Sequence, residues 1–195
     1  EKLEYLNNIP TPVMAVDREM NIRFINQAGA DTVKRTVEAC MGQKCYQLFK
    51  TGHCNSDDCA VARAMRENAV ATNNTIAKLP SGELPIRYTG APIKDSKGNV
   101  VGAFTYVTEI SEEHQAVAEI ESIVGAVLNG RLDVRGNPAK YKIVGFKNVI
   151  KGVNDTLDAV VKPVNEAAEV LERLAANDLT SRVTGEYKGD LAKIK

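Results

Sequence analysis

The sequence contains no tryptophan, and aromatic residues make up only 5% of its 195 residues. It has no excess charge of either sign, because 25 lysines and arginines balance 25 aspartates and glutamates. Neither half contains a basic or acidic block, which argues against a nucleic-acid partner. No apolar run approaches the ~18 residues of a membrane-spanning helix. We also expect no signal peptide. The composition is typical of a globular domain.

The chain begins at Glu1 rather than methionine, so we expect it to be part of a longer protein, which leaves room for a membrane segment elsewhere in that protein. Its length allows one large domain or two small ones. The pattern changes near residue 111. Nearly all turn signals and all four cysteines precede this point, and long helical patterns follow it. We therefore expect domains over 1–111, 112–162 and 163–195.

Alternating apolar residues and intervening turns predict five strands in the first part. Their ranges are 11–17, 21–26, 70–78, 84–93 and 100–109. Two helices are predicted between the second and third strands, over 27–34 and 59–68. Asn26 is the candidate N-cap of the first, and Asp57 or Asp58 of the second. This order predicts an α+β domain, with an antiparallel sheet covered by helices on one face.

Three motifs in this part resemble the PAS sensory domain, over about residues 5–111. They are the asparagine of Phe24-Ile25-Asn26-Gln27-Ala28 at a strand-to-helix junction, the segment Gly42-Gln43-Lys44-Cys45-Tyr46-Gln47-Leu48-Phe49, and the closing Glu109-Ile110-Ser111. The last is similar to the Asp-Ile-Thr that ends many PAS domains. The resemblance implies that Glu109, Ile110 and Ser111 pass a signal to a following helix.

The resemblance also implies a cavity for a small molecule between the sheet and the helices. Tyrosine and arginine side chains suit the orientation of a polar ligand within an apolar wall. The alternative is that the aromatic residues only fill the core, with Arg87 exposed by strand alternation. The candidate cavity residues are Phe24, Tyr46, Phe49, Arg87, Tyr88, Phe104 and Tyr106.

All four cysteines fall within twenty residues, in the spacing C-x4-C-x8-C-x4-C. They are Cys40, Cys45, Cys54 and Cys59. Four thiolates can hold a tetrahedral metal ion or an iron–sulfur cluster. They can equally form disulfides or a thiol redox sensor. The third interpretation is that they are small hydrophobic residues in the helical region.

The second part predicts two helices. The first ends at Gly130, and the second runs from about Phe146 until Asn177 ends it. In the longer helix, apolar residues recur in steps of three and four, with one extra step of four near Leu157. This spacing is typical of a coiled-coil seam. Pro163 lies inside this pattern and favours a bend.

Residues 119–142 repeat as residues 166–188, with an offset of about 47 residues. Each copy has a helix led by glutamate, a stop, a connector containing a leucine, and a Tyr-Lys pair. The copies resemble the HAMP relay module, in which two helices per chain form a parallel four-helix bundle in a homodimer. Ile143-Val144-Gly145 departs from the acidic residue that usually opens the second HAMP helix, whereas Asp190 matches it in the second copy.

A PAS domain followed by HAMP units is similar to the layout of methyl-accepting chemotaxis transducers. We therefore expect a cytoplasmic sensory and relay segment of a membrane receptor, coupled to a downstream signalling domain. No phosphate loop or nucleophile motif is present, so we expect no enzymatic activity. A ligand would act by favouring one of two helix packings. The alternatives are a sensor histidine kinase fragment, a redox or metal-binding module, and a dimerising scaffold with an empty cavity.

Overall fold

The computed structural model describes residues 2–195. The chain divides into two compact units, the first ending at Ser111 and the second running from Glu112 to Lys195. None of the described helices combines the length and the apolar character that crossing a bilayer requires.

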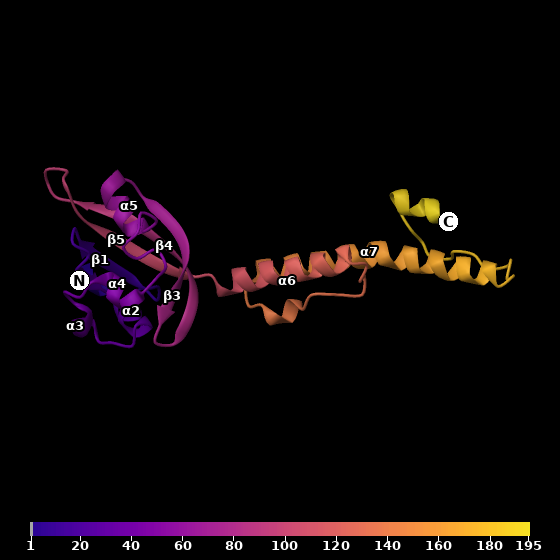
Figure 1. Ribbon diagram of the computed structural model, residues 1–195, viewed down its shortest axis with the longest axis horizontal. Coiled ribbons are helices and arrows are strands. Elements are labelled where there is room, and N and C mark those ends of the chain that lie inside the picture. The colour runs from indigo at the N-terminus through magenta and orange to yellow at the C-terminus, as the bar shows by residue number, and fades with distance from the viewer. Residues whose placement is uncertain (1) are drawn as a thin grey trace. The chain divides into compact units, whose positions relative to one another are not determined.

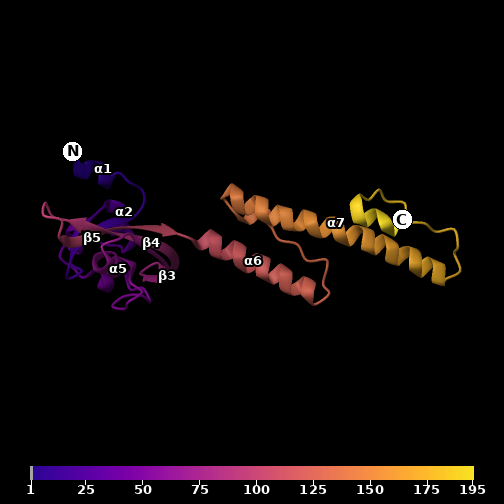
Figure 2. The same ribbon diagram turned by 90° about the horizontal axis from the view of Figure 1, so that it is seen from above.

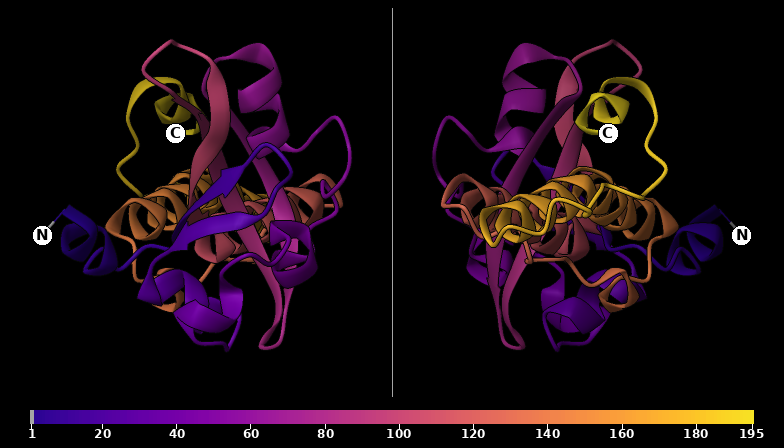
Figure 3. Two further views of the ribbon diagram at one scale, coloured as in Figure 1. Left: turned by 90° about the vertical axis from the view of Figure 1, so that its left-hand side faces the viewer. Right: turned by 90° about the vertical axis from the view of Figure 1, so that its right-hand side faces the viewer.

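The first unit is built around a five-stranded antiparallel sheet with the strand order β2-β1-β5-β4-β3 (Figure 1). The twist of this sheet is visible in the end-on views of Figure 3. All five predicted strands are confirmed, with their ends moved by one or two residues at most. The strands are β1 (Val13–Asp17), β2 (Ile22–Ile25), β3 (Ala71–Leu79), β4 (Gly82–Lys94) and β5 (Val100–Glu109).

Short helices fill the chain between β2 and β3. They are α2 (Gln27–Thr32), α3 (Val37–Cys40), α4 (Cys45–Phe49) and α5 (Ala60–Glu67), while α1 (Lys2–Asn7) precedes the sheet. The cap predicted for the first helix is confirmed, because Asn26 Oδ1 accepts a hydrogen bond from the Gly29 amide at 2.9 Å. The same side chain bonds the Val13 amide and the Ile9 and Thr11 carbonyls, so it joins β1, α2 and the segment before the sheet.

The cap predicted for α5 is wrong. Its N-cap residue is Cys59, not Asp57 or Asp58, and no side chain of the loop caps the helix. Instead, the Tyr88 hydroxyl on β4 accepts a hydrogen bond from the Ala60 amide at 3.2 Å. The helix start is therefore satisfied by a tertiary contact, which the local sequence pattern does not contain.

The main core lies between one face of the sheet and helices α2 to α5. Met14, Val16 and Ile86 enter it from the strands, and Leu48 and Val61 enter it from the helices. Gly90 shows how closely α5 approaches β4. A Cβ atom at position 90 would lie 2.7 Å from the Ala60 carbonyl oxygen, so only glycine permits this packing.

The second unit contains α6 (Ser111–Leu128), η1 (Pro138–Lys140), α7 (Val144–Ala175) and η2 (Gly189–Ile194). Figure 2 shows α6 and the first part of α7 as neighbouring helices that run in the same direction, joined by an extended connector that includes η1. The helix stops predicted at Gly130 and Asn177 are confirmed. Both residues have a positive φ, of 79° and 65°. α7 continues through Pro163, although proline removes one of its backbone hydrogen bonds.

Candidate functional site

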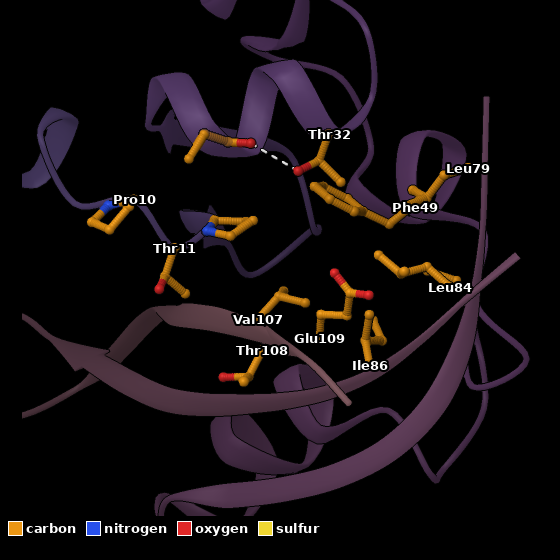
Figure 4. Close-up of a pocket in the computed structure, with 13 residues that line it drawn as sticks. Pro10, Thr11, Thr32, Phe49, Leu79, Leu84, Ile86, Val107, Thr108 and Glu109 are labelled. Carbon is orange, nitrogen blue, oxygen red and sulfur yellow. Dashed lines mark hydrogen bonds between the residues drawn. The ribbon is translucent and has the colours of Figure 1, made fainter. Parts of the chain in front are cut away.

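A cavity of about 320 Å³ lies where β5 ends (Figure 4). This volume is at the lower end of the ~300–1,000 Å³ typical of small-molecule pockets. The lining is mostly apolar, and Glu109 contributes a carboxylate to it. The lining residues are Pro10, Thr11, Pro12, Ala28, Thr32, Phe49, Ala77, Leu79, Leu84, Ile86, Val107, Thr108 and Glu109. We refer to this space as the exit cavity.

The three residues predicted to relay a signal all lie beside the exit cavity or directly after it. Glu109 is the last residue of β5 and pairs with Ile86 on β4. Ile110 is buried, and its amide donates to the Pro85 carbonyl at 2.9 Å. Ser111 is the first residue of α6, rather than a cap outside it. The segment that lines the end of the exit cavity therefore leads directly into α6.

A second cavity of about 40 Å³ lies deeper, between the sheet and helices α4 and α5. This volume is far below the ~300 Å³ at which small-molecule pockets begin, so the inner cavity is largely filled by its own side chains. Three of the candidate cavity residues, Tyr46, Phe49 and Tyr88, line it together with three of the four cysteines. Thr105 also faces this space. Its Oγ1 is the one fully buried side-chain oxygen or nitrogen that lacks a hydrogen-bond partner within residues 2–195.

Tyr88 connects β4 to the loop before α5. Its hydroxyl accepts from the Ala60 amide, donates to the Asp58 carbonyl at 3.4 Å, and lies 3.1 Å from His53 Nδ1. Burial raises the pKa of Tyr88 to about 12, so the hydroxyl stays protonated at neutral pH. The position of this loop is therefore linked to the central part of β4.

The four cysteines do not form one cluster. Cys45, Cys54 and Cys59 line the inner cavity, whereas Cys40 is not among its lining residues and is fully buried, which raises the pKa of its thiol. All four are free thiols. In the part of the chain that the structure describes, no three His, Cys, Asp or Glu side chains are placed to hold a metal ion. This arrangement fits separate thiols better than a tetrahedral metal centre.

Four of the predicted cavity residues line neither cavity. In β5, Ala103 and Thr105 point toward the core, so Phe104 and Tyr106 lie on the opposite face of the sheet. Phe24 shares that outer face, because Phe24 and Phe104 both pair with Ala15. Arg87 also lies there, and its Nε donates to Asn74 Oδ1 at 3.0 Å. The prediction followed residue type, whereas strand alternation decides which face each side chain occupies.

The helical unit contains a hydrogen-bonded arrangement that joins its first helix to the following connector. Glu119 on α6 accepts from the Asn137 amide at 2.6 Å and from the Tyr141 hydroxyl at 2.5 Å, with Lys140 Nζ at 3.5 Å. These bonds lower the pKa of Glu119, with the tyrosine bond as the largest cause. Burial and the bond to Glu119 raise the pKa of Tyr141 to about 12. We call this group the first clasp.

The same arrangement recurs 47 residues later, as the second clasp. Glu166 on α7 accepts from the Thr184 amide at 2.6 Å, the Gly185 amide at 2.9 Å and the Tyr187 hydroxyl. The bond from Tyr187 is the largest cause that lowers the pKa of Glu166 to about 2. The sequence repeat is therefore also a repeat of contacts.

Two further features of the connectors agree between the copies. Arg135 Nη1 donates to the Leu132 and Val134 carbonyls, and Arg182 Nη1 donates to the corresponding carbonyls of Leu179 and Ser181. The helix ends agree as well, because the amides of residues 131 and 178 each bond to the carbonyl five residues earlier. Both connectors therefore leave their helices in the same way.

At the start of α7, a glutamate from another helix takes the place of the acidic residue that the first copy of the repeat lacks at Ile143-Val144-Gly145. Ile143 is the N-cap and offers no capping side chain. The carboxylate of Glu112, in the first turn of α6, accepts from the Ile143 amide at 2.9 Å and from the Lys142 amide at 3.1 Å. In the second copy, Asp190 lies in the first turn of η2.

The sequence alone does not reveal the roles of Thr105, Glu112, Glu119 and Glu166. The repeat already contained both glutamates and both tyrosines of the clasps, so it gave a signal for these positions. It did not show that each glutamate bonds to its tyrosine, because the pairing depends on how the connector folds back along the helix. No local pattern marks Thr105 as a buried hydroxyl without a partner.

Comparisons with known families agree with this geometry. A family model described as the PAS fold matches residues 6–115, which is more than half of the chain. A second model, described as the HAMP domain, matches residues 144–195. This match begins with α7 and includes the second clasp. It crosses the boundary that we predicted between residues 162 and 163.

One curated relative is the methyl-accepting chemotaxis protein McpB of Pseudomonas aeruginosa, which is 25% identical over 198 residues. The match covers 97% of this chain but only 28% of the relative. Among solved structures, a PAS domain from Colwellia psychrerythraea is 17% identical with a TM-score of 0.51, covering 57% of this chain and 95% of that one. An RNA-binding light-oxygen-voltage receptor is 12% identical with a TM-score of 0.54, covering 64% and 36%. These two likenesses show the fold alone.

Proposed function

The chain belongs to the PAS fold family and joins a PAS domain to a HAMP domain in a signal-transduction module, and from this premise we propose that it is the sensory and relay segment of a chemotaxis transducer. The relative in Pseudomonas aeruginosa supports this more specific assignment, since its match extends through both domains. In this proposal the segment is cytoplasmic, its parent is a membrane receptor, and its role is not enzymatic.

The observation that carries the proposal is the position of the exit cavity. Glu109 lines this cavity and ends β5, and α6 begins two residues later. A small molecule that fits an apolar space and donates a hydrogen bond or a positive charge to Glu109 would act directly on the start of α6. Such a ligand shifts the relay only if it binds one of the two states more tightly.

The two clasps suggest how movement of α6 reaches α7. Glu112 and Glu119 tie α6 to the connector and to the first amides before α7. Glu166 then ties α7 to the second connector. Because α7 is one continuous helix, a shift at its start also displaces the second clasp, which is anchored at Glu166 on α7. We propose that this continuity carries the signal through the helical unit.

The relay also requires a partner, and we propose a parallel homodimer. One stripe of α7 exposes apolar side chains: Val149 and Val160 at 49%, Val164 at 45% and Leu171 at 65%. Fully burying one such side chain contributes about 1.5–3 kcal/mol. The opposite stripe carries charged residues, including Lys151, Asp155 and Lys162. A second copy of α7 would cover the apolar stripe and leave the charged one in water.

Sedimentation equilibrium of the whole chain tests this assembly. We expect the mass of two chains at micromolar concentration. Val160→Glu would place a charge in the apolar stripe of α7 and raise the dissociation constant of the dimer by ~100-fold or more. Each tenfold change in this constant corresponds to about 1.4 kcal/mol. Asn148→Glu adds the same charge on another side of α7 and should leave the dimer intact. A monomeric wild-type chain, or equal effects of the two variants, would contradict the proposal.

A further inference from the structure

Three thiols lie around the inner cavity, and their surroundings differ. Cys45 is buried at the start of α4, whereas Cys54 and Cys59 are half-buried, with Cys54 inside the loop between α4 and α5 and Cys59 at its end. Burial, followed by the nearby sulfurs of Cys59 and Cys54, raises the pKa of Cys45 to about 12. Cys45 is therefore held as an unreactive thiol, since the thiolate is the nucleophile in disulfide chemistry.

Cys54 is placed to react first. Its sulfur accepts a hydrogen bond from the Thr51 amide at 3.2 Å and lies 3.3 Å from the Thr51 hydroxyl. Partial exposure lets a small molecule reach this sulfur. Cys59 is the second half-buried thiol on the same cavity, and it immediately precedes the first turn of α5.

We propose that Cys54 and Cys59 form a reversible disulfide by exchange with a low-molecular-weight disulfide. The Cys54 thiolate attacks one sulfur of that molecule, forms a mixed disulfide and releases one thiolate. The Cys59 thiolate then attacks the Cys54 sulfur, forms the Cys54–Cys59 bond and releases the second thiolate. Two protein thiols are oxidised and one small disulfide is reduced to two thiols. The two protons lost by the protein are taken up by the released thiolates.

The surrounding contacts give this reaction a route to the sheet. His53 precedes Cys54, and Asp58 and Ala60 flank Cys59. All three bond to the hydroxyl of Tyr88. A disulfide between the two cysteines would close this loop and change its three contacts with the Tyr88 hydroxyl. Tyr88 pairs with Val107 on β5, two residues before Glu109. The inference deepens the proposed function by naming a stimulus, a small oxidant read by thiols, and only this sensory consequence rests on that function.

Peptide mapping of the whole chain tests the reaction. The reduced protein is equilibrated with oxidised glutathione, free thiols are alkylated after unfolding, and peptides are identified by mass spectrometry. We expect a Cys54–Cys59 cross-link with Cys40 and Cys45 alkylated. Cys59→Ser should stop the reaction at a glutathione adduct on Cys54, and Cys54→Ser should abolish the cross-link. Cys40→Ser is the matched control and should leave it unchanged.

A cross-link that contains Cys40 or Cys45, or no cross-link in excess oxidised glutathione, would overturn the proposed pair. Hydrogen exchange of the oxidised and reduced protein tests the sensory consequence. We expect altered exchange in residues 51–60 and also in residues 105–113. A cross-link that changes only the loop would overturn the sensory role. Sedimentation of the same samples reports the dimer separately, so failure of the thiol pair is distinguishable from failure of the relay.

Discussion

Removing the carboxylate of the first clasp should release the first connector from α6. In Glu119→Ala, the Asn137 amide and the Tyr141 hydroxyl lose their shared acceptor. Hydrogen bonds to a charged group contribute about 1.5–3 kcal/mol each, and a buried polar group left unpaired costs about 1–3 kcal/mol. Tyr141 is only 1% exposed, so its hydroxyl has little access to water as a replacement.

We therefore expect the free energy of opening the first connector to fall by about 3–5 kcal/mol in Glu119→Ala. Glu119→Gln keeps an acceptor oxygen and loses only the charge, so we expect a loss of about 1 kcal/mol. Each loss of about 1.4 kcal/mol in the opening free energy makes amide exchange through that opening about tenfold faster. The connector amides should therefore exchange at least ~100-fold faster in the alanine variant and about fivefold faster in the glutamine variant.

Hydrogen exchange with mass spectrometry on the whole chain measures these rates. The diagnostic peptide covers residues 131–143, and peptides from the sheet serve as the internal control. Glu166→Ala is the matched variant in the second clasp and should accelerate exchange only over residues 178–188. The reasoning is refuted if Glu119→Ala leaves the first connector unchanged, or if alanine and glutamine have the same effect.

Three further predictions concern other contacts. Asn26→Ala should destabilise the first unit by about 3 kcal/mol or more in urea unfolding, because it leaves several buried backbone groups unpaired; an effect below about 1 kcal/mol would contradict this assignment. The second clasp should weaken in acid. The folded pKa of Glu166, about 2, lies below its ordinary value of 4.5, so its contribution is present above pH 4.5 and is lost as the pH falls toward 2. Exchange over residues 178–188, corrected for intrinsic rates, should show this loss, and Glu166→Gln should remove most of the dependence. Pro163→Ala should raise the melting temperature of the helical unit, because α7 already continues through this residue and the backbone hydrogen bond that alanine restores outweighs the packing of the buried proline ring; an unchanged or lower melting temperature would contradict this balance.

The sequence predicted what depends on local chemistry. Turn residues and alternation located the five strands, and Gly130 and Asn177 ended their helices because both adopt the left-handed conformation. The cap of α5 could not be found locally, since it comes from Tyr88, 28 residues away. The cavity residues were predicted only in part. Phe24 and Phe104 are as aromatic as Phe49, but the register between strands places them on the outer face.

For the two clasps, the sequence indicates the residues but not the contacts between them. The repeat identified the glutamates and tyrosines as corresponding positions in the two copies. Their pairing depends on how each connector folds back along its helix, which the sequence does not show. A repeated sequence therefore indicated repeated structure, while the contacts that explain the repeat depended on the tertiary fold.

The central claim is that α7 packs in parallel against α7 of a second copy, and distance measurement between spin labels tests it most directly. Nitroxides would be attached through a ketone side chain introduced at position 148 or 172, so that the native thiols remain. These positions are 24 residues apart, or about 36 Å along a helix. A parallel dimer predicts one distance of about 20–30 Å at both positions, since packed helices lie about 8–10 Å apart. Distances beyond about 36 Å at both ends, as in an antiparallel pair, or no dipolar coupling at all, would contradict the account.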